Sequence, residues 1–329
     1  MIRLDKVKII SSIDNIKEID EEKFSIIVKN GIITEYKYTQ LSPYSLYIEK
    51  DLEEGELVLE FTGKILRDRY PELISKENIR ECLNNINDLG VCWIDVDAIL
   101  QDGVVTKADV SMDAECGEIK AITEGICANV KNNRKYIVER KKDNLIIRNN
   151  NQTKNLQLRL CIYDKLAEMK QGCNRDFLIS LPNKNEMLQY FRNKVRFEMN
   201  LNSKEQIRRR LHIAHTSIRN VLDAEVAPIK PFLDEILVEQ PTPRAIKSMR
   251  DYDRWQTLQA NDYDLKKLET IVRKYKADGT RISQAMKPYT DMCYYLKNDG
   301  SESIREQLDN LLCEDIYIHR VYQFKNRTL

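Results

Sequence analysis

The chain has 329 residues, 42% of them apolar and 32% charged, and a formal net charge of +1 at pH 7. This composition excludes a disordered chain, and the length suffices for one large domain or two ordinary ones. No stretch reaches the roughly 18 consecutive apolar residues that span a membrane, and the first twenty residues lack the apolar segment of a signal peptide. We therefore expect a cytoplasmic protein with no membrane partner.

The cysteines and histidines do not indicate a structural metal. The eight cysteines form no C-x-x-C pair, and a chain of this length needs no disulfides to fold. His212 and His215 lie three residues apart in HIAH, without a nearby cysteine. This pattern favours two half-exposed helix histidines over a zinc site.

Strand and turn signals alternate along the first 202 residues. Three strands with Asn-Gly, Ser-Pro and Glu-Gly turns are predicted between residues 24 and 62, and a hairpin with a Lys-Asp-Asn turn between 134 and 150. Further strands are predicted at 91–99, 105–113, 158–165 and 195–202, and helices at 75–89 and 118–131.

Helical patterns dominate after residue 202. Ser203 and Gln206 form a capping-box signature, helical spacing continues to about Asp223, and four of the eight prolines fall between 228 and 244. The sequence therefore predicts an α+β fold: an antiparallel sheet with helices packed on one face, followed by a helical C-terminal region. The expected domains are an α+β domain at 1–202, a helical extension or linker at 203–235 and a helical domain at 236–329.

Three of the predicted strands each have one apolar and one polar face. Because side chains alternate strictly in a strand, and an antiparallel sheet can leave one face open, neighbouring strands of this kind would gather their polar side chains on one surface. The apolar residues are Ala108, Val110, Met112, Leu158, Leu160, Ile162, Val195, Phe197, Met199 and Leu201; the polar ones are Asp109, Ser111, Asp113, Arg159, Cys161, Tyr163, Lys165, Arg196, Glu198 and Asn200.

Such a surface suits phosphate chemistry. Carboxylates on a rigid sheet can hold a divalent cation, which polarises a phosphate oxygen. A phenol can attack that phosphate and form an ester, while arginine and lysine neutralise the charge of the transition state. The alternative is an ordinary half-buried sheet with salt bridges, in which Tyr163 only packs.

Two basic clusters could contact nucleic acid, although solvated faces look the same. The segment 131–148 carries seven cations and two carboxylates, and three arginines are consecutive at 208–210. The candidate DNA-binding residues are Arg159, Arg140, Lys141, Lys142, Arg208 and Arg209.

The order of these motifs resembles the rolling-circle replication initiators of plasmids and filamentous phages, in particular the gene II/X type of phage replication protein, which are related to HUH-type endonucleases. The resemblance covers roughly 57–201 and rests on four matches in family order: LEFTGKIL (59–66), VTKADVSMD (105–113), LRLCIYDKLAEMK (158–170) with its Tyr-x-Lys-x-x-Glu pattern, and VRFEMNL (195–201). The family's His-hydrophobic-His motif is absent, which leaves the metal ligands open.

The resemblance implies a replication initiation protein that nicks and rejoins one DNA strand at an origin through a 5′-phosphotyrosine. Carried over, Tyr163 is the nucleophile, and Lys165 and Arg196 act beside the phosphate. Asp109 and Glu198 are the best positions for Mg²⁺ or Mn²⁺. Alternates are Asp113 and Glu168, and Glu60 is also within reach. The implied partners are single-stranded or supercoiled origin DNA and a host helicase, in the bacterial cytoplasm, with the protein a monomer or a homodimer.

Other functions remain open on the sequence. They are a mobilisation relaxase with the same chemistry, a DNA-binding protein without nuclease activity, and a metal-dependent nuclease that uses water. Residues 271–296 could form a helix-turn-helix that enters the major groove or could simply pack. Trp255, Tyr294 and Tyr295 are expected in the core.

Overall fold

The computed structural model describes residues 2–131, 135–142, 144–150, 153, 157–237, 246–275, 279–298 and 304–312. The chain divides into two compact units: unit 1 comprises Met1–Ile236 and Asp309–Leu329, and unit 2 comprises Leu237–Leu308. None of the helices in the described ranges is long and apolar enough to cross a membrane. The separate roles expected for the parts of the chain stay predictions.

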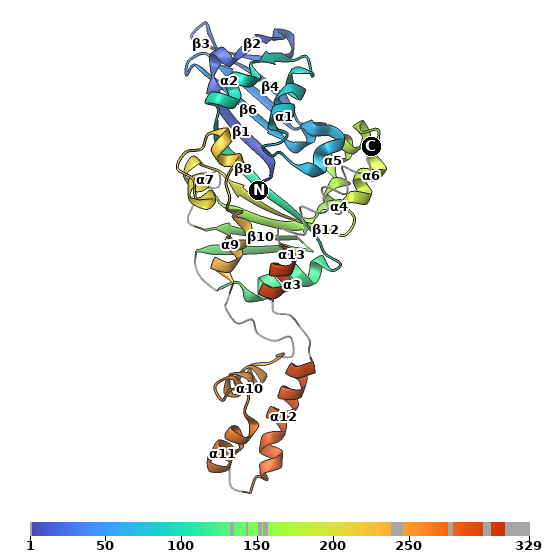
Figure 1. Ribbon diagram of the computed structural model, residues 1–329, viewed down its shortest axis with the longest axis vertical. Helices are drawn as coiled ribbons and strands as arrows, with labels where there is room; N and C mark the ends of the chain where they lie inside the picture. Colours follow the sequence, from blue (N-terminus) through green and yellow to red (C-terminus); the bar gives the residue numbers. More distant parts are fainter. Residues whose placement is uncertain are drawn as a thin grey trace. The chain divides into compact units, whose positions relative to one another are not determined.

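Unit 1 is built on one antiparallel sheet (Figure 1). Among the described residues the sheet has ten strands in the order β3-β4-β5-β6-β1-β8-β12-β11-β10-β9, and β2 pairs with β7 separately. The strands are β1 (Leu4–Ser12), β2 (Ile16–Ile19), β3 (Ser25–Lys29), β4 (Ile32–Gln40), β5 (Leu46–Asp51), β6 (Glu56–Thr62), β7 (Cys92–Ile94), β8 (Val104–Glu115), β9 (Tyr136–Lys141), β10 (Asn144–Asn149), β11 (Arg159–Asp164) and β12 (Lys194–Leu201).

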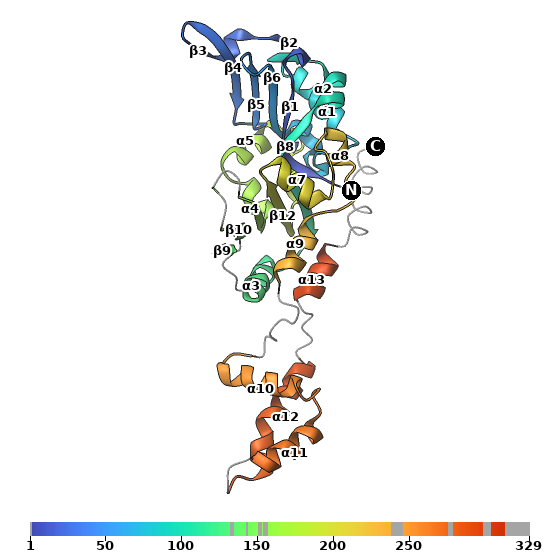
Figure 2. The same ribbon diagram turned by 90° about the vertical axis from the view of Figure 1, so that its left-hand side faces the viewer.

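Helices lie between and beside these strands, and the turned view separates them from the meander of β3 to β6 (Figure 2). Those of unit 1 are the 3-10 segments η1 (Ile13–Asn15), η2 (Glu21–Lys23) and η3 (Gly63–Glu72), and α1 (Ile79–Asn87), α2 (Val96–Asp102), α3 (Ile119–Asn129), α4 (Lys165–Met169), α5 (Gly172–Ser180), α6 (Lys184–Tyr190), α7 (Lys204–Leu211), α8 (Ile218–Leu222) and α9 (Ile229–Ile236). Unit 2 contains α10 (Met249–Gln259), α11 (Leu265–Tyr275) and α12 (Ile282–Asn298), and α13 spans Ile304–Leu311. The predicted α+β class, with its antiparallel sheet and helical C-terminal region, is confirmed.

The Asn-Gly turn shows how local sequence sets the register of the sheet. Lys29 pairs with Ile32, so the loop between β3 and β4 is only two residues long. Asn30 and Gly31 both have positive φ, 53° and 79°. A two-residue hairpin of this type needs positive φ at both positions, which Asn-Gly adopts at low cost.

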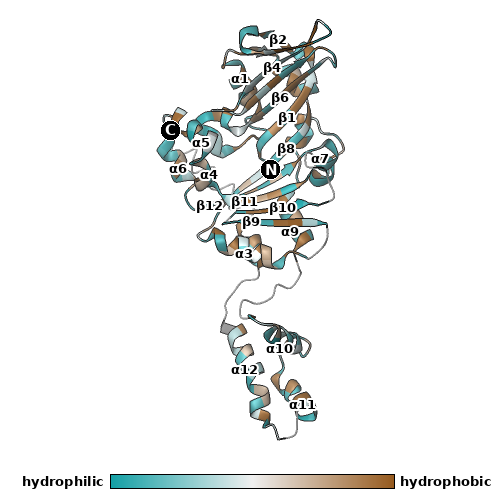
Figure 3. Cartoon of the chain, turned by 180° about the vertical axis from the view of Figure 1, so that it is seen from behind, coloured by the Kyte–Doolittle hydropathy of each residue, from teal (hydrophilic) through white to brown (hydrophobic). Residues whose placement is uncertain are grey.

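The apolar face of the sheet forms the core of unit 1. Leu160, Phe197 and Met199 have no exposed surface, and hydrophobic and hydrophilic stretches alternate along the strands (Figure 3). Helix α8 approaches this face closely: a Cβ on Gly103 would lie 2.7 Å from Ile218 Cδ1 and 3.1 Å from Ile9 Cγ2. Glycine is therefore required where the chain passes from α2 into β8.

Two local predictions were wrong. The strand expected over 91–99 ends at Ile94, because Asp95 caps a helix there, with its Oδ1 accepting from Ala98 N at 3.1 Å. Trp255 is buried in the core of unit 2 as expected, but Tyr294 and Tyr295 are 68% and 62% exposed. Part of the turn expected within 271–296, residues 276–278, lies outside the described residues.

Candidate active site

The register of β8, β12 and β11 brings the predicted polar side chains onto one face. Directly paired residues in antiparallel strands share a face, so three rows run across the sheet. They are Asp113–Arg196–Tyr163, Ser111–Glu198–Cys161 and Asp109–Asn200–Arg159.

The first row is a buried ion pair rather than an open catalytic group. Arg196 Nε and Nη2 donate to the two oxygens of Asp113 at 2.6 and 2.7 Å, and neither side chain has exposed surface. The guanidinium also lies over the rings of Tyr70 and Phe191. In this conformation Arg196 has no surface with which to touch a phosphate.

Asp5 completes this network, although its place in the sequence alternation points it to the other face. Leu4 pairs with Val110 and Lys6 with Asp109, so Asp5 is the extra residue of a β-bulge. Bulges re-aim side chains and are common beside active sites. Here the bulge lets Asp5 Oδ1 accept from Arg196 Nη1 at 2.6 Å and from Tyr70 Oη at 2.8 Å. Burial opposes ionisation of Asp5, but these neighbours outweigh it and hold its pKa below the usual value.

Lys165 does not continue the alternation of β11. The strand ends at Asp164, which caps α4 by accepting from Ala167 N at 2.9 Å. Lys165 is 1% exposed and binds Glu168 Oε2 at 2.7 Å. Its ammonium lies 5.7 Å from the ring centre of Tyr163. The side chain therefore contributes positive charge beneath the tyrosine instead of lying on the strand's polar face.

A cluster of buried apolar residues explains why this end of the polar face is closed. Tyr70 from η3 packs edge-to-face on Phe177 of α5, at 5.4 Å between ring centres, and next to Phe191 after α6. The predicted open face is thus open only in part.

Tyr163 and Glu198 lie at the border of the closed and open parts, and both are half-buried. The Tyr163 phenol donates to Glu198 Oε2 at 2.6 Å, while Asn200 Nδ2 donates to Glu198 Oε1 at 3.0 Å. Burial and the Glu198 carboxylate raise the pKa of Tyr163 well above its usual value. The resting phenol is therefore neutral, and Glu198 is placed to take its proton.

Asp109 is the second carboxylate of the open part. Burial and the nearby Glu198 carboxylate raise its pKa to about 7. The pKa of Glu198 is also raised, by burial and by Asp5. Two buried carboxylates that resist ionisation are the donor set that a divalent cation would relieve.

The metal ligands proposed from the sequence are not all equally placed. Within the described ranges no group of three or more His, Cys, Asp or Glu side chains is arranged to hold a metal ion. Asp113 is bound at both oxygens by Arg196, Glu168 is bound to Lys165, and Glu60 is ion-paired with Lys6. Asp109 and Glu198 thus remain the better candidates. Mg²⁺ commonly uses only one or two carboxylates together with water and substrate phosphate.

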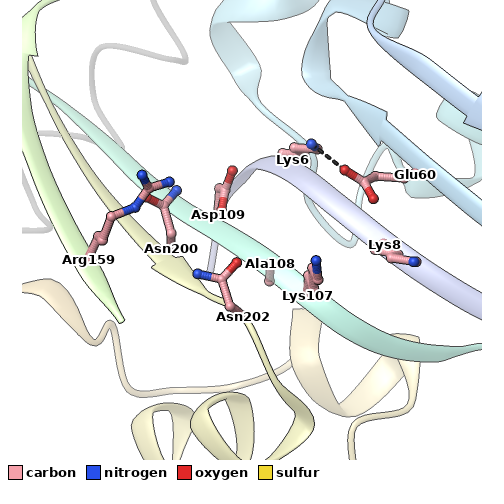
Figure 4. Close-up of a pocket in the computed structure, with 9 residues that line it drawn as sticks. All are labelled: Lys6, Lys8, Glu60, Lys107, Ala108, Asp109, Arg159, Asn200 and Asn202. Atoms are coloured by element: carbon pink, nitrogen blue, oxygen red, sulfur yellow. Dashed lines mark ion pairs between the residues drawn. The ribbon is translucent and has the colours of Figure 1, made fainter. Parts of the chain in front are cut away.

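A pocket of about 130 Å³ opens beside Asp109 (Figure 4). It adjoins the row that contains Asn200 and Arg159, and strand β1 supplies two of its lysines. The lining residues are Lys6, Lys8, Glu60, Lys107, Ala108, Asp109, Arg159, Asn200 and Asn202. Sequence reasoning missed the β1 residues, although the alternation of Lys6 and Lys8 with Val7 and Ile9 was a readable signal.

The other predicted DNA contacts lie on the surface of unit 1. Arg140 pairs with Glu124 and Arg208 with Glu205. Lys141, Lys142 and Arg209 are exposed, while Arg134 of the first cluster lies outside the described residues. None of these side chains lines the pocket beside Asp109.

Comparisons with known proteins bear on the same part of the chain. No curated protein and no solved structure matches it. Residues 95–219 match a family model that describes the N-terminal part of a phage replication-associated protein. The matched segment contains β8, β11 and β12, and with them Tyr163, Asp109 and Glu198. The match supports a phage rolling-circle replication initiator family for this chain.

Proposed function

We propose that this protein nicks and rejoins one DNA strand at a rolling-circle origin, with Tyr163 as the nucleophile. The observation that carries the proposal is the 2.6 Å hydrogen bond from the Tyr163 phenol to Glu198, within the segment that matches the replication-associated family. A nucleophile within hydrogen-bond reach of its base is the arrangement that covalent catalysis requires.

The chemistry follows from that pair. Tyr163 Oη attacks the scissile phosphorus and passes its proton to Glu198. The bond from phosphorus to the 3′ oxygen breaks, the leaving oxygen takes a proton from water, and the 5′ phosphate stays on the tyrosine. Rejoining is the reverse: the 3′ hydroxyl attacks the phosphotyrosine and the phenol recovers its proton.

Buried cations support this step without touching the phosphate. Lys165 lies beneath the Tyr163 ring and Arg196 lowers the cost of negative charge on its oxygen. A charge fixed in a site of low dielectric acts more strongly than the same charge in water. Asp109, with Glu198, would hold Mg²⁺ or Mn²⁺, which when bound polarises a phosphate oxygen.

A water-using nuclease is the second candidate, and the raised pKa of Tyr163 is the observation that favours it. In that scheme Tyr163 only holds Glu198 in place, and cleavage leaves no protein on the DNA. The relaxase and the purely DNA-binding alternatives predict, respectively, action at a transfer origin and no cleavage. Origin DNA, a host helicase and the bacterial cytoplasm are the partners and location that the leading proposal requires.

A denaturing gel separates these schemes. The protein is incubated with single-stranded and supercoiled DNA of the replicon that encodes it, with Mg²⁺ or Mn²⁺. We expect a covalent DNA–protein band that Tyr163→Phe abolishes. Tyr47→Phe is the matched control, because Tyr47 also donates to a glutamate of the same sheet, Glu49, at 2.8 Å. Cleavage that survives Tyr163→Phe without an adduct would replace the proposal by the water scheme.

A further inference from the structure

The pocket beside Asp109 contains more positive charge than its carboxylates balance. Lys6, Lys8, Lys107 and Arg159 line it against Glu60 and Asp109. Glu60 is already bound to Lys6, as Figure 4 shows. In the described part of the chain no carboxylate forms an ion pair with Lys8, Lys107 or Arg159.

The strand register forces two of these lysines together. Lys8 of β1 and Lys107 of β8 are direct cross-strand partners. Like charges in that position destabilise a sheet. The next pair is Ile9 with Val105, so Thr106 is an extra residue that bulges out of β8 beside Lys107. A fold that accepts this repulsion at the mouth of a pocket is arranged for an anion.

The pocket also lies at a useful distance from the reacting tyrosine. Arg159 and Tyr163 are on the same face of β11, four residues apart, which is about 13 Å of strand at about 3.3 Å per residue. A few nucleotides of single strand span such a distance. A chain of phosphates that crosses Tyr163 therefore reaches the pocket without leaving the sheet.

We propose that this pocket, formed by Lys8, Lys107 and Arg159, binds a backbone phosphate of the single strand whose scissile phosphate lies at Tyr163. The inference rests on the proposed function and adds a second contact point to it. The pocket contacts a phosphate and no base, so its contribution is independent of sequence and sensitive to salt.

The test is the affinity of the full chain for labelled single-stranded oligonucleotides of several sequences, measured by fluorescence anisotropy over a range of salt. For Lys8→Ala/Lys107→Ala we expect an affinity loss of at least about fivefold at low salt, equal for all sequences. The slope of log K against log salt should fall by about 0.7 for each phosphate that the variant no longer binds. Lys120→Ala, an exposed lysine on α3 outside the pocket, should bind as the wild type does.

Stability and anion controls keep the result unambiguous. Removing two facing lysines should leave the melting temperature equal or higher, so weaker binding cannot be attributed to unfolding. Unchanged affinity and slope in the double variant would overturn the inference. So would an equal loss in Lys120→Ala, or a lysine-dependent melting shift that inorganic phosphate alone produces as fully as DNA. If binding depends on the lysines but no tyrosine adduct forms, the pocket stands and the proposed nicking function fails.

Discussion

Arg196 Nε and Nη2 bind both carboxylate oxygens of Asp113 beneath the polar face of the sheet. The pair lies opposite Tyr163 in the strand register, yet it is fully buried. The sequence interpretation treated both residues as groups that act directly on metal or phosphate. Their geometry instead makes them the rigid base on which the Tyr163–Glu198 pair is mounted.

Breaking that pair should cost stability first. Asp113→Ala leaves the buried guanidinium with only Asp5 as a carboxylate partner, and removing one partner of a buried pair typically costs about 3–5 kcal/mol. We expect a loss near the lower end, about 3 kcal/mol, in the free energy of unfolding measured with urea. Lys107→Ala, exposed on the same strand, should change it by less than about 0.5 kcal/mol. Similar values for both variants would contradict the structural role.

The alternation of β8, β11 and β12 was sufficient to predict which side chains share the polar face, because period two is a property of the strand itself. It was not sufficient to predict Asp5. A β-bulge inserts one residue and reverses the facing of that position, and nothing in LDKVKII marks where the insertion falls.

Burial was the other feature hidden from the sequence. Whether Arg196 and Lys165 meet solvent depends on Tyr70 and Phe191, which arrive from segments far away in the chain. No local pattern reports such a packing. The same limitation explains Tyr294 and Tyr295, whose helical spacing suggested a core but which lie exposed on α12.

Asp109 should make stability depend on pH and on divalent cations. Its pKa in the folded protein, about 7, lies above the value of 3.8 for an unperturbed carboxyl. Ionising it therefore costs the fold nothing below about pH 3.8, increasingly more up to about 7, and the full amount above that. Asp109→Asn should be more stable than the wild type at pH 8, on the order of 2 kcal/mol, with little difference at pH 4.

Cation binding should reverse this advantage. Mn²⁺ or Mg²⁺ that binds only the folded state raises its melting temperature by mass action, and we expect that rise in the wild type and not in Asp109→Asn. Asp113→Asn tests the alternate ligand and should retain the rise if the protein remains folded. An equal shift in the wild type and in Asp109→Asn would exclude Asp109 as a ligand.

Unit 2 should be separable from the chemistry. All residues of the proposed reaction lie in unit 1. Replacing residues 246–303 by a flexible linker should leave adduct formation on single-stranded oligonucleotides within about threefold, and should weaken binding to duplex origin DNA if α11 and α12 recognise it. Unchanged duplex affinity would exclude recognition by unit 2. Loss of the adduct in a folded variant would show that unit 2 contributes to the reaction.

Glu198→Gln tests the proton transfer most directly. The amide keeps the shape of the side chain and can still accept from Tyr163, but it cannot take the proton. We expect adduct formation to slow by about 10²- to 10⁴-fold, the usual contribution of a general base. The pKa of Glu198 is raised by burial and by Asp5, so the wild-type rate should rise with pH as Glu198 ionises and then level off, while the variant lacks that rise.

The matched control is Glu49→Gln, because Glu49 accepts from Tyr47 in the same way on β5. It should leave both the rate and its pH profile unchanged. A metal role for Glu198 alone predicts a different result, since raising the Mn²⁺ concentration would then restore much of the rate of Glu198→Gln. If the rate recovers in this way and keeps its dependence on pH, Glu198 is a ligand and not the base, and the proton of Tyr163 must leave by another route.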